Sequence, residues 1–304
     1  MCLSLHIRYP LKMRKVYSVC DSWSPKDKEF LMSFGIKVKS EFERIYFPDE
    51  EPYYELRKAL SKRTFDGPYY EYTDEELLAA TYCVFRGGYT SGYPKPENSY
   101  LEKTFDTGRM CPKCNLGRVQ DNPFRVGKLS KHKLWGYCAW EFDPLFVTDD
   151  IYDKVFAPYG IQRRPLLHAS GKVVEGMSQL VIPVTDEPLD LYPYRYEICP
   201  ECGRKRYLPG EIIKHPYFPL HKHPLPGIYM TKEVVGQGCQ ISHYTLVSAE
   251  IIRQLLALKV ITSPSRHLQV PCTPDISQYW APDDGSDRRY VSPEYHIGII
   301  GNDR

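Results

Sequence analysis

Two cysteine pairs of the same design constrain the fold of this chain more than any other feature. The sequence reads Cys111-Pro-Lys-Cys114 and, after a long interval, Cys199-Pro-Glu-Cys202. A two-residue spacer lets both thiolates of one turn point at a single ion, and two such turns complete a tetrahedral shell of four sulfur atoms. The fold then has to bring together two segments that are 84 residues apart. We predict one structural zinc ion per chain, with these four cysteines as ligands.

The separation of the two pairs leaves an alternative open. A compact zinc ribbon separates its pairs by about 15 to 20 residues, so a shared site here requires a long insertion. Two independent redox pairs or unrelated buried thiols are the alternative, but neither pair precedes a helical pattern that would lower a thiol pKa. Asn115 and Gly203 follow the two pairs, and both residue types suit the left-handed backbone of a metal knuckle. These features favour a metal, zinc first and iron as the alternative.

A shell of four cysteines also limits the chemistry. It saturates zinc and leaves no coordination position for water or substrate, so the sequence does not support hydrolytic zinc chemistry. The chain contains no nucleophile elbow, zinc-protease helix, phosphate-binding loop or kinase motif. We therefore expect a protein that is not an enzyme and has no catalytic residues.

The composition is that of a folded globular protein with one or two domains. Apolar residues make up 42% of the 304 residues and charged residues 26%, which excludes a chain kept disordered by its charge. No apolar run reaches the roughly 18 residues of a membrane span, and His6 and Arg8 interrupt any secretory signal. We expect a cytoplasmic protein without membrane contact, starting at Met1 or Met13. The other cysteines are expected to be small buried residues: Cys2, Cys20, Cys83, Cys138, Cys239 and Cys272.

Residues 1–105 are predicted to form a mainly helical, acidic N-terminal region. Between Glu41 and Glu76 eleven carboxylates face five basic residues. Capping residues and prolines mark three helix starts, and a short strand is expected between the first two helices. The expected elements are a helix from Ser24 to Gly35, a strand at Ile36–Val38, a helix after Pro52 and a helix from Thr73 to Phe85.

Two ten-residue segments, one hundred residues apart, can be aligned with each other. Thr148–Ala157 and Ser248–Ala257 each follow a strand-like run, begin with a hydroxyl cap and continue as a short helix with one apolar face. Each copy also follows a cysteine pair, so we interpret residues 106–275 as a zinc-knuckle module of two similar strand-helix half-units. The predicted fold class is α+β, and residues 276–304 are expected to form an irregular C-terminal tail.

Two further groups of residues have a possible binding role. His215, His221 and His223 lie in a proline-rich segment without a carboxylate at a useful interval, so we expect a solvated loop rather than a metal site. A basic run leads into several aromatic residues, a mixture suited to phosphate contacts and base stacking. Its members are Arg109, Lys113, Arg118, Arg125, Lys128, Lys131 and Lys133, followed by Trp135, Tyr137 and Trp140. A solvated face above an aromatic core explains the same residues.

The double cysteine pair resembles a known family. The second pair, Cys199-Pro-Glu-Cys202-Gly, and the later segment Leu246-Val-Ser-Ala-Glu-Ile-Ile-Arg-Gln-Leu are similar to the double-CxxCG motif proteins of myxobacteria, which are grouped with immunity proteins. The resemblance covers residues 106–262, although Asn115 stands where the motif has glycine. It implies four metal ligands, no catalytic residue and a protein partner, most naturally a cognate polymorphic toxin that the protein neutralises. The alternative function is that of a zinc-ribbon protein that binds nucleic acid.

Overall fold

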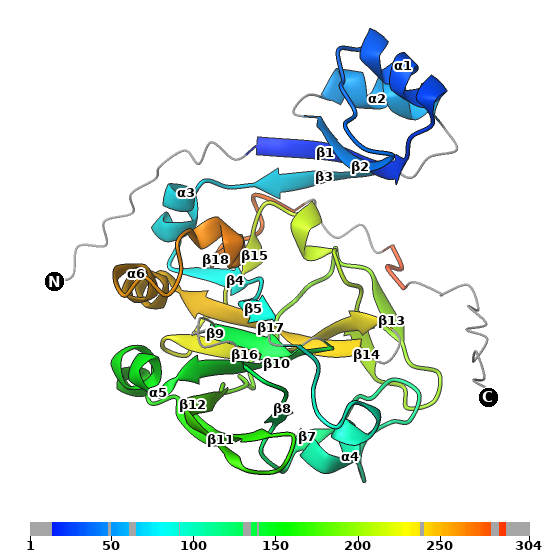
Figure 1. Ribbon diagram of the computed structural model, residues 1–304. Coiled ribbons are helices and arrows are strands. Elements are labelled where there is room, and N and C mark those ends of the chain that lie inside the picture. Colours follow the sequence, from blue (N-terminus) through cyan, green and yellow to red (C-terminus); the bar gives the residue numbers. More distant parts are fainter. Residues whose placement is uncertain are drawn as a thin grey trace, which may run out of the picture. The chain divides into compact units, whose positions relative to one another are not determined.

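The structure is a computed structural model in which two units interleave along the chain (Figure 1). The described residues are 14–47, 50–60, 65–90, 92–129, 135–138, 140–237, 240–280 and 286–289. The first unit comprises Met1–Arg86, Ile212–Lys222 and Leu246–Tyr279, and the second comprises Gly87–Glu211, His223–Thr245 and Trp280–Arg304. The domain limits expected at residues 105 and 275 stay a prediction, and both expected starts, Met1 and Met13, lie outside the described residues.

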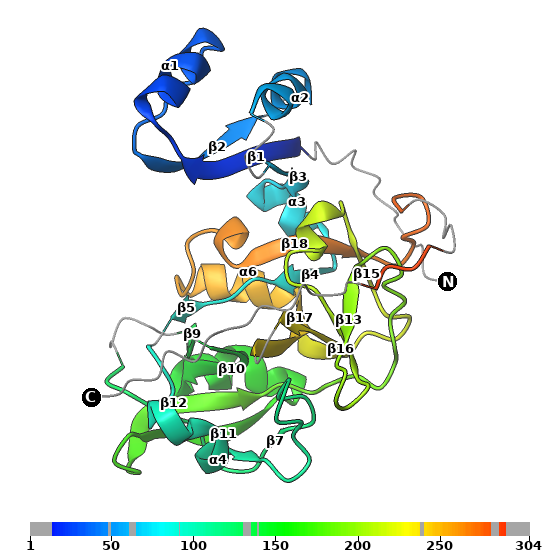
Figure 2. The same cartoon turned by 90° about the vertical axis from the view of Figure 1, so that its right-hand side faces the viewer.

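The N-terminal part of the first unit is an antiparallel sheet with strand order β2-β1-β3. Its elements are β1 (Arg14–Ser22), α1 (Pro25–Ser33), β2 (Phe42–Phe47), α2 (Glu50–Ala59) and β3 (Phe65–Glu71). Figures 1 and 2 both show α1 and α2 on the same face of this sheet. Tyr17, Val19 and Trp23 from the β1 side pack with Leu31 of α1 and Leu56 of α2, so this region has an apolar core of its own.

The prediction of a mainly helical N-terminal region is wrong, because three strands form its centre. These strands contain residues that favour a pleated surface, such as Tyr46 and Tyr69. Strand β1 lacks the usual alternation, because Val16, Tyr17 and the two residues after them are all buried, whereas β2 does alternate between exposed and buried residues from Arg44 to Phe47. A burial pattern without period two gives no alternation for sequence reasoning to detect.

The expected helix starts at Ser24 and Thr73 are present, whereas α2 begins at Glu50, two residues before the expected Pro52, and the third helix is shorter than predicted. Ser24 caps α1 with a capping box, and Thr73 does the same for α3 (Asp74–Ala79). Ala80 is already extended, and Tyr82–Phe85 form strand β4. Cross-strand pairing of these aromatic and β-branched residues outweighs the helical pattern that the sequence shows there. Ile36–Val38 forms no strand, which corrects a second expectation.

The rest of the first unit is a sheet edge with helices. β4 lies between the end of β17 and β18, and the order is β17-β4-β18-β15. The elements are η4 (Ile212–Lys214), β15 (Phe218–Pro219), β17 (Gln240–Ser248), α6 (Ala249–Ala257), η5 (Pro264–Arg266) and β18 (Leu268–Thr273). Arg253 of α6 donates to the carbonyl oxygen of Leu78 in α3 at 2.7 Å, which joins these two helices. The residues of β17 belong partly to each unit.

The second unit is built mainly of strands. One sheet has the order β5-β9-β10-β12-β11-β8, a second part has the order β13-β14-β16-β17, and β6 pairs with β7. The elements up to the first repeat are β5 (Tyr89–Thr90), η1 (Glu97–Ser99), α4 (Tyr100–Thr104), β6 (Phe105–Asp106), β7 (Val119–Gln120), β8 (Arg125–Val126), β9 (Trp135–Cys138) and β10 (Glu141–Thr148). The later elements are α5 (Asp149–Ile151), η2 (Tyr152–Phe156), η3 (Ala157–Tyr159), β11 (Gln162–His168), β12 (Val173–Val181), β13 (Tyr196–Ile198), β14 (Lys205–Tyr207) and β16 (Ile228–Gln237).

The predicted succession of strand and helix occurs in both copies of the repeat, but only the second copy has the predicted hydroxyl cap, from Ser248. β10 leads through Thr148 into α5, and β17 leads through Ser248 into α6. The first copy continues as a π-helical turn, η2, whereas the second is a regular α-helix. The fold class as a whole was predicted wrongly. The described chain is mostly β-sheet in several sheets, rather than a helical region followed by a small zinc-knuckle module.

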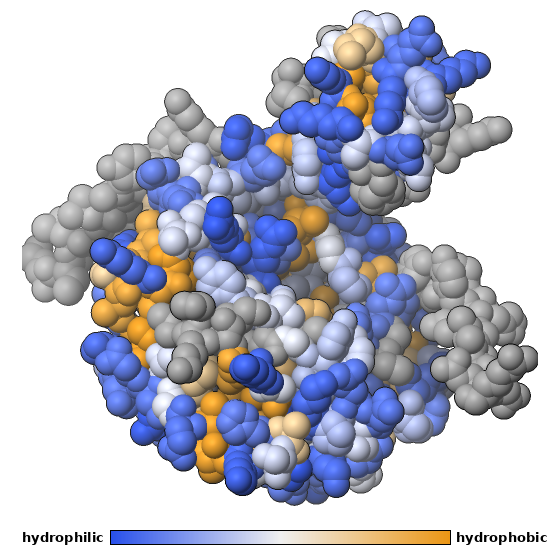
Figure 3. Space-filling view, in the orientation of Figure 1, coloured by the Kyte–Doolittle hydropathy of each residue, from blue (hydrophilic) through white to orange (hydrophobic). Residues whose placement is uncertain are grey.

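The described part of the C-terminal tail contains little regular structure. Residues 286–289 hold a single bridge, between Tyr196 and Arg289, and residues 281–285 and 290–304 lie outside the described residues. On the face drawn in Figure 3, hydrophilic residues predominate and hydrophobic residues form separate groups. Within the part of the chain that the structure describes, none of the helices combines the length and apolar character that crossing a bilayer requires.

Candidate metal centre

The first cysteine pair lies in a tight turn between β6 and β7. The backbone N–H of Cys111 donates to the carbonyl oxygen of Leu116 at 2.9 Å, and the N–H of Asn115 donates to that of Cys111 at 2.8 Å. Asn115 has φ 58°, a left-handed conformation that only glycine and a few polar residues adopt readily. These features direct the side chains of Cys111 and Cys114 to the same side of the turn, as the spacing predicts.

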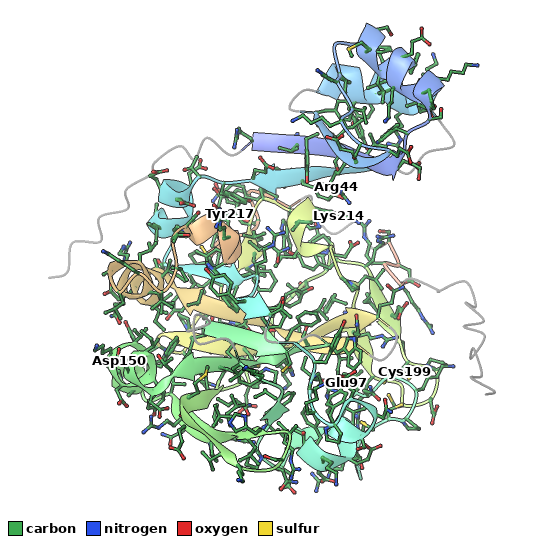
Figure 4. All side chains as sticks on the ribbon, in the orientation of Figure 1. Arg44, Glu97, Asp150, Cys199, Lys214 and Tyr217 are labelled. Carbon is green, nitrogen blue, oxygen red and sulfur yellow. The ribbon has the colours of Figure 1, made fainter. Side chains whose placement is uncertain are left out.

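The second pair repeats this turn between β13 and β14. The N–H of Cys199 donates to the carbonyl oxygen of Arg204 at 3.0 Å, and the N–H of Gly203 donates to that of Cys199 at 2.9 Å. Gly203 has φ 69°. The two turns therefore share both hydrogen bonds and the left-handed residue, position by position, and Cys199 of the second turn is labelled in Figure 4.

The two turns bring their four sulfur atoms together. The sulfur of Cys111 lies 3.9 Å from that of Cys199, and the sulfur of Cys114 lies 3.7 Å from that of Cys202. All four ligand atoms lie within 4.8 Å of one another. A tetrahedron with metal–sulfur bonds of about 2.3 Å has sulfur–sulfur edges of about 3.8 Å, whereas a disulfide bond measures about 2.05 Å. The distances fit four ligands around one ion and exclude disulfides between the turns.

The sulfur cluster is shielded from solvent. Cys111, Cys114 and Cys199 are buried, and Cys202 is partly buried. Leu116 and Ile241 pack with them in one apolar cluster. A metal ion held there would lie among apolar side chains, which limits access of water and chelators to its ligands.

The thiols differ in how readily they ionise. Burial opposes ionisation of Cys199, but the backbone N–H groups of Cys202 and Glu201 hydrogen-bond to its sulfur and lower its pKa to about 7. Burial raises the pKa of Cys114 to about 12. A bound cation favours the thiolate form of every ligand, so it removes this difference.

Equivalent residues of the two turns face each other. Cys111 contacts Cys199, Cys114 contacts Cys202, and Arg204 donates to the carbonyl oxygen of Leu116 at 2.6 Å, each pair being 88 residues apart in sequence. Contacts between like positions are what a local two-fold arrangement produces. The four-cysteine cluster is thus assembled from two copies of one turn, each supplying two of the cysteines.

The other cysteines do not join the cluster. Cys83, Cys138 and Cys272 are buried, as predicted, and burial raises the pKa of each thiol, that of Cys138 to about 12. Cys2 and Cys239 lie outside the described residues, as does the side chain of Cys20. Among the residues that the structure describes, the four-cysteine cluster is the only group of three or more potential ligands close enough to hold an ion.

The histidine cluster and the basic run have different outcomes. His221 is buried whereas His223 is exposed, and no ligand group among the described residues includes either. Within the basic run, Arg118 is not free for phosphate, because its guanidinium is buried and lies 2.7 Å from a carboxylate oxygen of Glu141. Lys131 and Lys133 lie outside the described residues.

Sequence reasoning missed a group of buried polar side chains beside the metal centre. Glu141 also accepts a hydrogen bond from the hydroxyl of Tyr100 at 2.8 Å, and burial raises its pKa. Asp143 accepts the backbone N–H of His243 at 2.8 Å. Asp143 and His243 are 100 residues apart in the sequence, which is the offset that relates the two repeat segments. Treating the repeat as a pair of facing copies would have predicted this contact.

Comparison with known proteins adds no assignment to this geometry. No family model, no curated protein and no solved structure matches the chain. The interpretation of the four-cysteine cluster as a metal site therefore depends on the distances between its sulfur atoms and on the paired turns that carry them.

Proposed function

We propose that this chain is a zinc-stabilised, non-enzymatic protein that binds a protein partner, in the first place a cognate toxin. Cys111, Cys114, Cys199 and Cys202 would hold the zinc ion. Four thiolates fill a tetrahedral shell, so the ion would supply stability rather than a bound nucleophile. Its effect would be to lock two distant segments of the second unit together.

An exposed aromatic group is the observation that supports a protein partner. Tyr93 is 45% exposed and Trp140 is 38% exposed, and their ring centroids lie 4.5 Å apart. Tyr100 lies behind Trp140, with its ring centroid 6.3 Å away. We call these three residues the aromatic patch. Tyrosine and tryptophan dominate the binding energy of protein interfaces, because they bury a large area with little loss of side-chain entropy.

The backbone conformation of Trp140 argues against a purely structural role for its ring. Its φ is 72°, and for a bulky residue this left-handed conformation is strained. Such strain persists where the surrounding structure enforces it, and it is found most often at functional positions. Trp140 precedes β10, whose first residue, Glu141, is held by Arg118 and Tyr100. That buried polar contact would fix the strand and with it the exposed ring.

The identity of the partner as a toxin comes from the family resemblance over residues 106–262. Local charge is compatible with a basic toxin, since the segment from Glu41 to Glu76 carries an excess of carboxylates. Some of these carboxylates have structural roles, however, because Glu76 completes the capping box of α3 and Glu43 accepts two backbone N–H groups. The aromatic patch therefore carries the proposal, and charge would only speed the encounter.

The decisive experiment uses the product of the neighbouring gene as the candidate toxin. We expect the full-length protein to co-purify with it and to restore growth when the two are expressed together. Replacing Tyr93 and Trp140 by Ala should weaken binding at least about tenfold, because both rings lose their contact area. Tyr46→Ala is the matched control, since Tyr46 is an exposed tyrosine of β2 in the first unit.

Two outcomes would overturn the proposal. One is a neighbouring product that is not toxic, or that is toxic but neither bound nor neutralised. The other is tight binding of single-stranded DNA or RNA that weakens steeply with salt, as neutralisation of several phosphates requires. In that second case the nucleic-acid function would replace ours.

A further inference from the structure

A groove of about 460 Å³ lies in the second unit beside the first cysteine turn. Its lining residues come mainly from strands β6, β7, β10, β11, β12, β16 and β17. Leu116–Arg118, after the first cysteine pair, and Arg204, after the second, also line it. Sites for small molecules in proteins measure about 300 to 1,000 Å³ and combine apolar walls with a few converging polar groups. The groove has the size of such a site. None of the three residues of the aromatic patch lines it, although Glu141, which follows Trp140, does.

The walls of the groove are largely apolar. Leu180 and Ile182 come from β12 and its end, and Met230 and Ile241 come from β16 and β17. All four side chains are more than nine-tenths buried, so they form a fixed surface rather than mobile surface groups. An apolar ligand body placed against them would lose its own contact with water at little cost in side-chain ordering.

Two arginines line this groove, Arg164 partly buried and Arg204 exposed, and each uses one guanidinium nitrogen in a hydrogen bond to a backbone carbonyl. Nη1 of Arg164 donates to the carbonyl oxygen of Gln120 at 3.1 Å, and Nη1 of Arg204 donates to that of Leu116 at 2.6 Å. Among the described residues, neither side chain forms an ion pair with a carboxylate. A guanidinium has five N–H donors, so each retains a planar array suited to a carboxylate or similar anion.

The chain makes room for one of these guanidinium groups. Gly117 has φ 93°, and a Cβ atom at this position would lie 2.0 Å from Nη1 of Arg204 and 2.5 Å from the carbonyl oxygen of Arg109. Any side chain at residue 117 would therefore displace Arg204. The position of Arg204 is thus built into the turn that follows the first cysteine pair.

The remaining charges leave the groove positive. Arg118 is compensated by Glu141, with which it forms a buried ion pair. Asp143 also lines the groove, and burial raises the pKa of its carboxyl, although nearby His243 and Arg118 oppose that shift. Nδ1 of His243 lies 2.8 Å from the carbonyl oxygen of Thr231, which can only accept, so this nitrogen carries a proton and donates to it. Charge and apolar walls together select an anion with an apolar body.

We propose that this groove binds a small organic anion, whose charged head contacts Arg164 and Arg204 and whose apolar body packs on Leu180, Ile182 and Met230. The proposal is independent of the toxin partner, since it needs neither the aromatic patch nor a second protein. It assigns the chain a second binding site, for a small molecule, next to the metal centre.

Fluorescence titration of the zinc-loaded, full-length protein with anilinonaphthalene sulfonate tests the proposal. This probe combines an anionic head with an apolar body. We expect one saturable site, competition by octanoate and no competition by 1-octanol, which has the same chain without the charge. Arg164→Gln should weaken binding at least about tenfold, because a charge-assisted, bidentate contact is lost.

Arg163→Gln is the matched control. Arg163 is the neighbour of Arg164 on β11, but its side chain points to the opposite face, where it lies over the ring of Tyr152 and near Asp149. Binding should be unchanged in this variant. Arg164→Lys, which keeps the charge but not the planar fork, should show an intermediate affinity.

Zinc content and thermal unfolding of each variant separate loss of the site from loss of the fold. If Arg204→Gln releases zinc, the Arg164 variants decide the question alone, since Arg164 is distant in sequence from both cysteine pairs. The absence of saturable binding, equal competition by 1-octanol, or equal effects of Arg163→Gln and Arg164→Gln would each overturn the proposal.

Discussion

Asn115 and Gly203 occupy the same position in two otherwise matching turns, and the side chain is the difference between them. Both have left-handed backbones, with φ 58° and 69°. A Cβ atom built on Gly203 would meet nothing within 4 Å, so the turn does not exclude a side chain there on steric grounds. The metal knuckle therefore depends on a backbone conformation, which asparagine and glycine tolerate better than other residues.

This conformation gives a first prediction. Asn115→Ala and Asn115→Gly both remove the amide, so the difference between them isolates the backbone. We expect the glycine variant to be more stable by about 1 kcal/mol, because alanine is strained in the left-handed backbone conformation and glycine is not. Gly203→Ala should lower stability by a similar amount. Urea denaturation of the zinc-loaded proteins measures both, and equal midpoints for the two Asn115 variants would contradict the argument.

Among the cysteines, burial alone does not mark a ligand. Cys138 is as deeply buried as Cys199 but belongs to no group of three or more potential metal ligands among the described residues. Cys199→Ser should abolish stoichiometric zinc binding and remove much of the stability of the second unit, since the ion binds only the folded state. Cys138→Ala should retain zinc and cost about 1 kcal/mol or somewhat more. Elemental analysis and calorimetry check both, and equal shifts would mean that the ligands are misassigned.

The repeat shows how like sequences become unlike elements. Ser248 accepts the backbone N–H of Ile251 and caps α6, whereas Thr148 forms no such bond at α5. In the first copy of the repeat, the carboxylate of Asp149, the residue after Thr148, instead accepts a hydrogen bond from the hydroxyl of Ser178 at 2.5 Å. The first helix then widens into the π-helical turn of η2, and the second stays regular.

Equivalent cap mutations should therefore have unequal effects. Ser248→Ala is expected to lower the free energy of unfolding by about 1 kcal/mol, because the orphan N–H at the start of α6 loses its acceptor. Thr148→Ala should change it by less than about half that amount. Thermal unfolding of the two variants in parallel gives the comparison, and a larger loss for Thr148→Ala would show that the hydrogen-bond pattern misleads.

The features that could be predicted from the sequence are those determined by residues close to one another in the chain. Caps such as Ser24 and Thr73 act within four residues, so their helix starts were predicted correctly. The end of the third helix was not, because pairing of Cys83 and Val84 with distant strands decides the structure there. The meeting of the four cysteines was predicted from their spacing, since a shared metal site requires the same local pattern twice. The groove beside them was not found, because its arginines and apolar walls share no spacing in the sequence.

At the scale of the whole molecule, the proposed metal ion would join two segments that are far apart in the sequence. All four ligands belong to the second unit, while the apolar core around Tyr17 and Leu56 belongs to the first. A single ion held by these cysteines would thus act on one unit directly. Its loss would leave a cluster of buried thiols whose pKa values differ, and the two turns would lose their common anchor.

Removal of zinc is accordingly expected to destabilise the units unequally. The purified protein should contain one zinc per chain, and a strong chelator should lower the thermal transition of the second unit well before that of the first. At free zinc of a thousand times Kd, binding stabilises the folded state by about 4 kcal/mol. Hydrogen exchange resolved by residue checks this, with restoration by added zinc as the control. A zinc content below about 0.2 per chain, or uniform loss of protection, would contradict it.

Strand β4 has a consequence for dissecting the chain. It lies between β17 and β18 in the sheet of the first unit, although it precedes both cysteine turns in the sequence. A fragment of residues 106–275 would keep β17 and β18 but lose the strand that separates them. Leu246 and its neighbours would then present unpaired backbone groups along two open edges, the kind of surface that recruits other chains. Such a fragment should aggregate even with its metal bound. Residues 106–275 are therefore not expected to fold independently of the rest of the chain.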